Sequence, residues 1–107
     1  MTPAPQVGEV WFVDFAYDEK PRWCLVVATA RDARLALASV VKITTEFADT
    51  PYELRLPRVP WLREQSYVNA QSVQPVALVE CVRKAPGKFD LAVLNDVRRV
   101  LRLWLNL

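Results

Sequence analysis

Histidine is absent from this sequence of 107 residues. Without histidine the chain cannot form a Ser-His-Asp or Cys-His triad, a histidine-ligated zinc site, or a pair of histidines acting as acid and base. Any catalysis must therefore rest on carboxylates, arginine, hydroxyls or backbone groups.

Long apolar runs and a signal peptide are also missing. No segment approaches the roughly 18 consecutive apolar residues that a membrane span needs. The first residues, MTPAPQVGE, lack a basic start followed by an apolar stretch. We therefore expect a cytoplasmic protein without a membrane partner.

The net charge of the chain is small, and it has only two cysteines. The chain has 14 Lys and Arg against 12 Asp and Glu, and a net charge of +2 does not by itself indicate nucleic-acid binding. Cys24 and Cys81 lie in apolar runs without CxxC spacing. This pattern predicts buried, reduced thiols and no metal site.

What the chain does contain is enough apolar side chain for one core. Hydrophobic residues make up 52% of the sequence and charged residues 24%, a composition typical of a folded protein. A chain of this length forms a single domain. We expect this domain to span residues 1–107, with the proline-punctuated residues 1–6 as a flexible tail.

Alternating and β-branched runs predict five or six short strands. Two prolines exclude strand and helix from 57–65, which we expect to be an ordered loop pinned by Trp61. Pro75 confines its segment to a sheet edge or a bulge. The predicted strands cover 7–15, 22–30, 35–45 and 52–56, followed by 66–70 and 72–84 as two strands or one bent strand.

A helix is predicted over 90–105, with Asp90 as its N-cap. Apolar residues recur at steps of three and four, which predicts a core-facing stripe of Leu91, Leu94, Val97, Leu101 and Leu105. Further apolar residues outside the stripe indicate contact with a second partner. The fold class is therefore mainly β, a strongly bent antiparallel sheet with a C-terminal helix.

Two polar sites stand at the ends of predicted strands. Arg22 begins one strand, and the segment KITTE ends the next with Thr44 and Thr45 on opposite faces. If these strand ends are neighbours, arginine and a hydroxyl converge on one anionic group, for which phosphate is the natural candidate. In the alternative, Arg22 pairs with Glu19 or Asp18 and Thr44 is an ordinary strand residue; composition alone favours this arrangement.

Several motifs, in order along almost the whole chain, carry a resemblance to a known family. The segments GEVWFVDF, RWCLVVATA, VVKITTE and SYVNAQSV, followed by a helical C-terminus, resemble the MazF/PemK family of toxin endoribonucleases. The resemblance implies a small SH3-like antiparallel barrel of the CcdB/MazF/PemK type. It also implies the toxin of a type II toxin–antitoxin pair, a sequence-specific mRNA interferase that cleaves single-stranded RNA without metal or cofactor.

Carried over by residue, the family's catalytic arginine falls on Arg22 and its threonine on Thr44. In the family these residues contact the scissile phosphate while the 2′-hydroxyl attacks, leaving a 2′,3′-cyclic phosphate and a 5′-hydroxyl. The candidate acids or bases are Glu19, Asp18 and Glu46. The candidate RNA-binding residues are Lys20, Thr45, Asn69, Gln71 and Gln74.

The sequence departs from the family pattern at three places. Proline precedes Arg22 here, whereas in the family it follows the arginine, and the first loop is shortened to AYDEKP. The late segment NAQSVQ lacks the arginine and acid that members often carry. Either Arg22 and Thr44 act with one of the nearby carboxylates, or the domain mainly binds.

Two other functions remain open on the sequence. The resemblance implies a homodimer and a short acidic antitoxin, but CcdB-like barrels instead inhibit DNA gyrase through the end of the last helix, which here is LWLNL with Trp104. A non-catalytic barrel that binds RNA or protein is the second alternative. In such a protein the bases of the RNA would stack on aromatic side chains, and the candidates are Trp11, Trp23, Tyr52, Trp61 and Tyr67.

Overall fold

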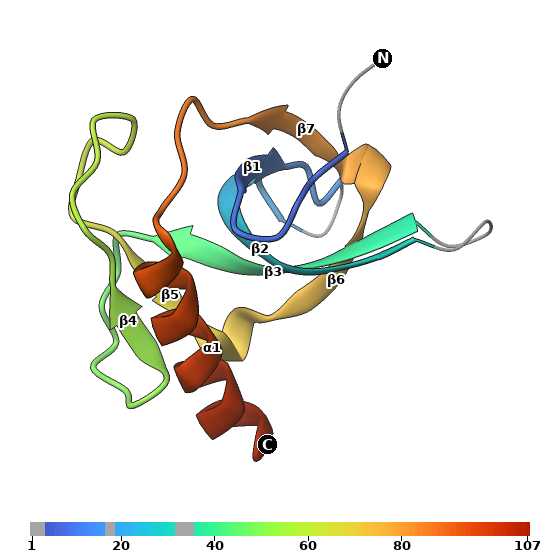
Figure 1. The fold of residues 1–107 in the computed structure, drawn as a ribbon. Helices are drawn as coiled ribbons and strands as arrows, with labels where there is room; N and C mark the ends of the chain where they lie inside the picture. The colour runs from blue at the N-terminus through green and yellow to red at the C-terminus, as the bar shows by residue number, and fades with distance from the viewer. Residues whose placement is uncertain (1–3, 17–18, 32–35) are drawn as a thin grey trace.

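The computed structural model describes residues 4–16, 19–31 and 36–107 (Figure 1). Seven strands form one bent sheet, and a single helix follows at the C-terminus and crosses one side of it. The strands are β1 (Val10–Val13), β2 (Arg22–Arg31), β3 (Ala36–Thr44), β4 (Glu53–Arg55), β5 (Tyr67–Asn69), β6 (Gln74–Ala77) and β7 (Cys81–Lys84). Two 3-10 turns, η1 (Ala70–Ser72) and η2 (Leu78–Glu80), separate the last three strands.

Every strand pair is antiparallel, and the sheet order is β4-β5-β3-β2-β1-β7, with β6 also paired to β3. This path is not closed into a complete barrel within the described residues. Strand β3 changes partner along its length, because β6 pairs with its first half and β5 with its end. At the changeover the Lys42 N–H donates to Ser72 Oγ at 2.9 Å, so no backbone donor is lost there. The change of partner places the end of β3 between β2 and β5.

The bent sheet has a core on each side. One core packs the helix against strands, and the other lies among β1, β2, β3, β6 and β7. Cys24 and Cys81 belong to the second core and are free, which confirms the prediction of buried thiols. Burial raises the pKa of Cys24 to about 12, so this thiol is no nucleophile at neutral pH.

The N-terminal strand is shorter than predicted. The chain turns at Gly8, whose φ of 93° suits glycine, and the ladder begins only at Val10. Residues 4–6, expected as part of a tail, contact the fold, since Pro5 is buried and the Gln6 N–H donates to Glu9 Oε1 at 2.8 Å. The strand lies inside the sheet, between β2 and β7.

The late part of the chain contains more elements than predicted. Instead of one strand over 72–84, η2 divides this segment into β6 and β7, which brings the number of strands to seven. A 3-10 turn of three residues leaves no mark on hydrophobic periodicity, so the pattern did not separate the two strands. Pro75 lies exposed in β6, which pairs only with β3, as expected for an edge.

Helix α1 (Leu91–Leu105) begins as predicted, with Asp90 Oδ1 accepting from the Val93 N–H at 3.1 Å. Asn106 ends it in the left-handed conformation, with φ of 60°. The predicted stripe is wrong at both ends, because Leu91 and Leu105 are 66% and 47% exposed. Among the described helices, none has the length and hydropathy to cross a membrane.

Candidate phosphate site

Arg22 and Thr44 lie side by side at one end of the sheet. Strand β2 begins at Arg22 and β3 ends at Thr44, and Cys24 pairs with Lys42 between them. The paired residues end at Cys24 and Lys42; continued by two residues along each strand, this register brings Arg22 opposite Thr44. Paired residues of an antiparallel ladder present their side chains on one face, about 5 Å apart. The condition for a shared anion site, that these strand ends are neighbours, is therefore met.

The same row continues across the next two strands. Thr44 pairs with Tyr67 of β5, and Tyr67 pairs with Arg55 of β4. Three strand spacings give this row a length of about 14 Å. Phe47 stacks on Tyr67 with ring centroids 4.9 Å apart and is 54% exposed. We call the row Arg22, Thr44, Tyr67 and Arg55 the polar strip: it carries a cation at each end with a hydroxyl and an aromatic ring between them.

The hydroxyl of Thr44 is oriented by the backbone beyond the strand. The Glu46 N–H donates to Thr44 Oγ1 at 3.1 Å. A hydroxyl that accepts this bond keeps its own proton for donation to another oxygen, such as that of a phosphate. The turn also brings Glu46, whose side chain is exposed, next to the strip.

Glu19 is the described carboxylate that contacts Arg22. Glu19 Oε2 lies 3.3 Å from Arg22 Nε, while Glu19 Oε1 forms an ion pair with Lys42. The hydrogen bond from Lys42 lowers the pKa of Glu19, and the charge of Arg22 adds to the effect against the opposing influence of burial. The alternative pairing of Arg22 with Glu19 is thus present, and it is compatible with a phosphate site because it involves only Nε. Asp18 lies outside the described residues.

The other sequence candidates fall into two groups. Lys20 and Thr45 are exposed and adjoin Arg22 and Thr44 in the chain. Asn69 Oδ1 instead accepts from the Gln71 N–H at 2.9 Å and caps η1, with Gln71 itself exposed there. Gln74 pairs with a residue four positions before Thr44 on β3, so the fold does not bring its side chain to the strip.

A small pocket adjoins the strip beside Trp23. Its volume is about 240 Å³, and its lining includes Thr44, Thr45 and Arg63. Trp23 contacts Phe12 edge to face at 5.2 Å. The pocket therefore places the Trp23 indole beside Thr44 and Thr45, on the face of β2 opposite to Arg22, as a surface on which a base can stack.

Most other aromatic candidates are accounted for by packing. Trp11 is buried, Tyr52 packs against Trp104 and Trp61 packs against Phe89. Among the five candidates, Trp23 and Tyr67 are the two that adjoin the phosphate site.

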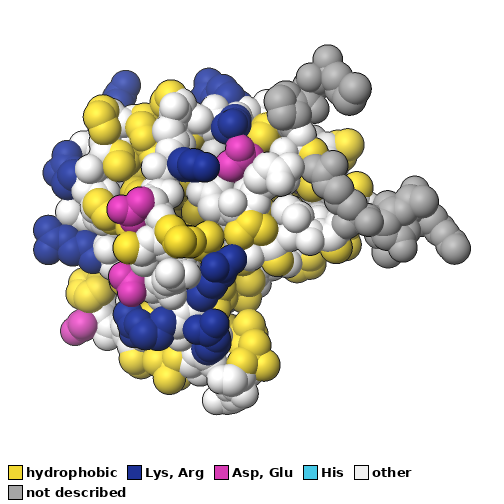
Figure 2. Space-filling view, viewed as in Figure 1, with side chains coloured by type: hydrophobic (Ala, Val, Ile, Leu, Met, Phe, Trp, Pro, Cys, Tyr) yellow, Lys and Arg dark blue, Asp and Glu magenta, His cyan; other side chains and the backbone are white. Residues whose placement is uncertain are grey.

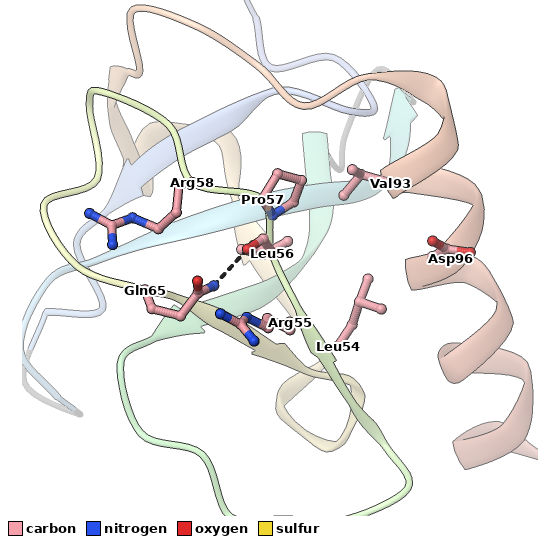
Figure 3. A pocket seen from close by; sticks show the side chains of 8 residues that line it. All are labelled: Leu54, Arg55, Leu56, Pro57, Arg58, Gln65, Val93 and Asp96. Carbon is pink, nitrogen blue, oxygen red and sulfur yellow. Dashed lines mark hydrogen bonds between the residues drawn. The ribbon is translucent and has the colours of Figure 1, made fainter.

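A second pocket, of about 430 Å³, lies at the far end of the strip (Figure 3). Arg55 and Arg58 project on one side of it, and helix α1 forms the opposite wall with Val93. Gln65 Nε2 donates to the Leu56 carbonyl at 2.6 Å and ties the two sides of the loop together. The pocket thus extends the positive charge of the strip beyond Arg55.

Comparisons with known proteins agree with this geometry. The family of PemK-like, MazF-like toxins of type II toxin–antitoxin systems matches residues 6–105. The chain belongs to this family. Among curated protein sequences none matches the chain.

Two solved structures illustrate the similarity of fold to this toxin. An endoribonuclease in complex with its cognate antitoxin, from a Mycobacterial species, is 25% identical, with a TM-score of 0.78 and coverage of 97% of each chain. A MazE–MazF complex from Deinococcus radiodurans is 20% identical, with a TM-score of 0.81 and coverage of 99% of each chain. The resemblance and the mainly β fold class expected from the sequence are therefore confirmed.

The toxin also has site residues that the sequence did not single out. Lys42, Phe47 and Arg55 reach the strip through pairing or stacking with distant parts of the chain. Alternation along KITTE places Lys42 on the same face as Thr44, and this was the one available signal. Nothing in the sequence pattern related Arg55 to Thr44, because β5 lies between them.

The toxin should lose stability between about pH 6 and pH 3, in part through Glu19. The pKa of Glu19 is lowered in the folded state, so its contribution is complete above the ordinary value of 4.5 and disappears as pH falls through the folded value. Melting temperatures across this range should fall by a few degrees less in Glu19→Gln than in the wild type. An equal fall in both proteins would contradict this contribution.

Proposed function

We propose that this toxin is an endoribonuclease that cleaves single-stranded RNA at the polar strip, with Arg22 and Thr44 on the scissile phosphate. The observation that carries the proposal is the pairing of β2 with β3, whose register, continued from Cys24 and Lys42, brings Arg22 beside Thr44. Support also comes from the 25% identical endoribonuclease, whose fold matches over 97% of the chain.

The chemistry needs charge stabilisation more than a metal ion. The 2′-oxygen attacks phosphorus, the bond to the 5′-oxygen breaks, and negative charge accumulates on the non-bridging oxygens in between. Arg22 offers a charged fork to two of these oxygens, and the Thr44 hydroxyl donates to one. In the described part of the chain, no three acidic or cysteine side chains come together as metal ligands would.

The proton of the 2′-hydroxyl needs an acceptor beside the strip. The lowered pKa of Glu19, caused first by Lys42, makes that carboxylate a weak base. Glu46 follows Thr44 by two residues, is exposed and forms no ion pair with another described residue. We assign proton acceptance to Glu46, and the departing 5′-oxygen takes its proton from water.

The surface of helix α1 suits protein partners. Basic side chains lie beside apolar ones over the lower half of the helix in the view of Figure 2. The apolar set is Leu103, Leu105 and Leu107, and the basic set is Arg98, Arg99 and Arg102. We propose a homodimer and a short acidic antitoxin as the occupants of such surfaces, acting in the cytoplasm where RNA is made. Trp104 packs edge to face on Tyr52, which accounts for part of its surface without a gyrase partner.

Cleavage by the purified toxin should survive removal of divalent metal. Single-stranded RNA is incubated with toxin freed of its antitoxin, with and without EDTA, and the expected rates are equal. The products should carry 5′-hydroxyl ends that a kinase labels directly and 2′,3′-cyclic phosphate ends. Loss of cleavage with EDTA, or inhibition of gyrase supercoiling in place of cleavage, would overturn the proposal.

A further inference from the structure

Lys42 lies on the same strand and face as Thr44, yet its side chain turns toward Glu19. Only 25% of this side chain is exposed, so its ammonium is partly removed from water. The ammonium lies 5.2 Å from the centroid of the Phe15 ring, within the range of a cation–π contact. The ring and the Glu19 carboxylate together hold the Lys42 ammonium in one place.

Glu19 divides its two oxygens between two cations. Oε1 contacts the Lys42 ammonium, and Oε2 lies 3.3 Å from Arg22 Nε. Nε of Arg22 is buried and makes no hydrogen bond among the described residues, although Glu19 Oε2 lies 3.3 Å away. The Glu19 carboxylate is therefore the described group that compensates this buried donor by charge.

An arginine that binds phosphate needs an oriented plane as well as a charge. Its two terminal nitrogens must face the phosphate oxygens together, and a contact at Nε fixes the plane without occupying them. Arg22 is the first residue of its strand and follows an exposed proline, so backbone pairing alone restrains its long side chain little. A carboxylate held rigidly behind Nε supplies the missing restraint.

We infer that Lys42 is a positioning residue of the phosphate site, which acts by holding the Glu19 carboxylate behind Arg22 Nε. The inference rests on the proposed function, since it needs Arg22 on the phosphate. In this arrangement a series of contacts runs from Phe15 through Lys42 and Glu19 to Arg22, which faces the phosphate. We call this series of contacts the relay. Lys42 itself does not touch the RNA.

A double-mutant cycle tests the relay against direct phosphate contact by Lys42. Lys42→Met and Glu19→Ala should each lower kcat for RNA cleavage about tenfold, as loss of an orienting partner does elsewhere. The double variant should be no slower than Glu19→Ala, because both changes break one relay. Lys42→Arg should keep kcat within about threefold of the wild type, because a second cation can hold the same carboxylate. Losses that multiply in the double variant, or a wild-type rate in Lys42→Met, would overturn the relay.

Lys84→Met is the matched control for loss of one positive charge. Lys84 forms the other described Lys–Glu ion pair, with Glu9 at 3.0 Å. The kcat of the Lys84→Met variant should equal that of the wild type. Melting temperature and antitoxin binding establish that each variant is folded. A slow Lys84→Met variant would assign the effect to net charge and overturn the positioning role.

A second readout separates the relay from the proposed function. The Nε–H resonance of Arg22, identified in ¹⁵N spectra by its absence in Arg22→Lys, should shift and exchange faster with water in Lys42→Met. An unchanged resonance overturns the relay whatever the kinetics show. Cleavage at the wild-type rate by Arg22→Ala would instead overturn the proposed site, while the spectra still report whether Lys42 holds Arg22.

Discussion

Arg22→Ala should lower kcat for RNA cleavage about a thousandfold, the upper range for loss of one group that stabilises charge in the transition state. Arg22 supplies a permanent positive charge and two parallel donors, and neither Thr44 nor water replaces both. The phosphate gains negative charge only as the 2′-oxygen attacks, so the loss should fall on kcat more than on KM. Single-turnover cleavage of a short labelled RNA measures it directly.

Two further variants separate chemistry from folding. Arg22→Lys should recover little of the rate, because an ammonium cannot present the planar fork of a guanidinium. Arg99→Ala removes an exposed arginine from helix α1 and should cleave at nearly the wild-type rate. If Arg22→Ala keeps its melting temperature and antitoxin binding yet still cleaves within tenfold of wild type, the phosphate lies elsewhere.

The site could be predicted from the sequence only where the signal is local. Arg22 directly precedes one apolar run and Thr44 directly follows another. Both residues therefore mark the ends of strands without any knowledge of the fold. Their meeting depends on the pairing of β2 with β3, and the connection between these strands is short enough for a hairpin. Lys42 was missed for a different reason: its partner Glu19 lies 23 positions away, and an ion pair between such residues leaves no periodic pattern.

The fold shows the same division between local and distant determinants. Helix α1 was predicted to within a residue because its cap and periodicity are local. Which of its apolar residues are buried depends on what packs against each end of the helix, which periodicity does not show, so Leu91 and Leu105 were assigned wrongly to the core. The change of partner along β3 was also unpredictable, because it depends on η1 placing Ser72 against the Lys42 N–H.

Thr44→Val should lower kcat about a hundredfold, less than Arg22→Ala because a hydroxyl carries no net charge. Valine keeps the shape and the strand preference of threonine, so the change removes the hydroxyl, both as donor and as acceptor of the Glu46 N–H, and leaves the packing. Thr45→Val is the comparison variant: Thr45 follows the end of β3 and lines the same small pocket, so a smaller loss of kcat is expected there than in Thr44→Val. Single-turnover cleavage rates of the two variants show which of the two hydroxyls the reaction needs.

The Thr44 and Thr45 pair also tests the pairing register itself. If β3 were shifted by one residue relative to β2, the two threonines would exchange faces and their effects would exchange as well. A large loss in Thr45→Val with none in Thr44→Val would therefore contradict both the site and the register that places it. A large loss in Thr44→Val alone places the functional hydroxyl at residue 44, where it accepts from the Glu46 N–H and lies beside Arg22.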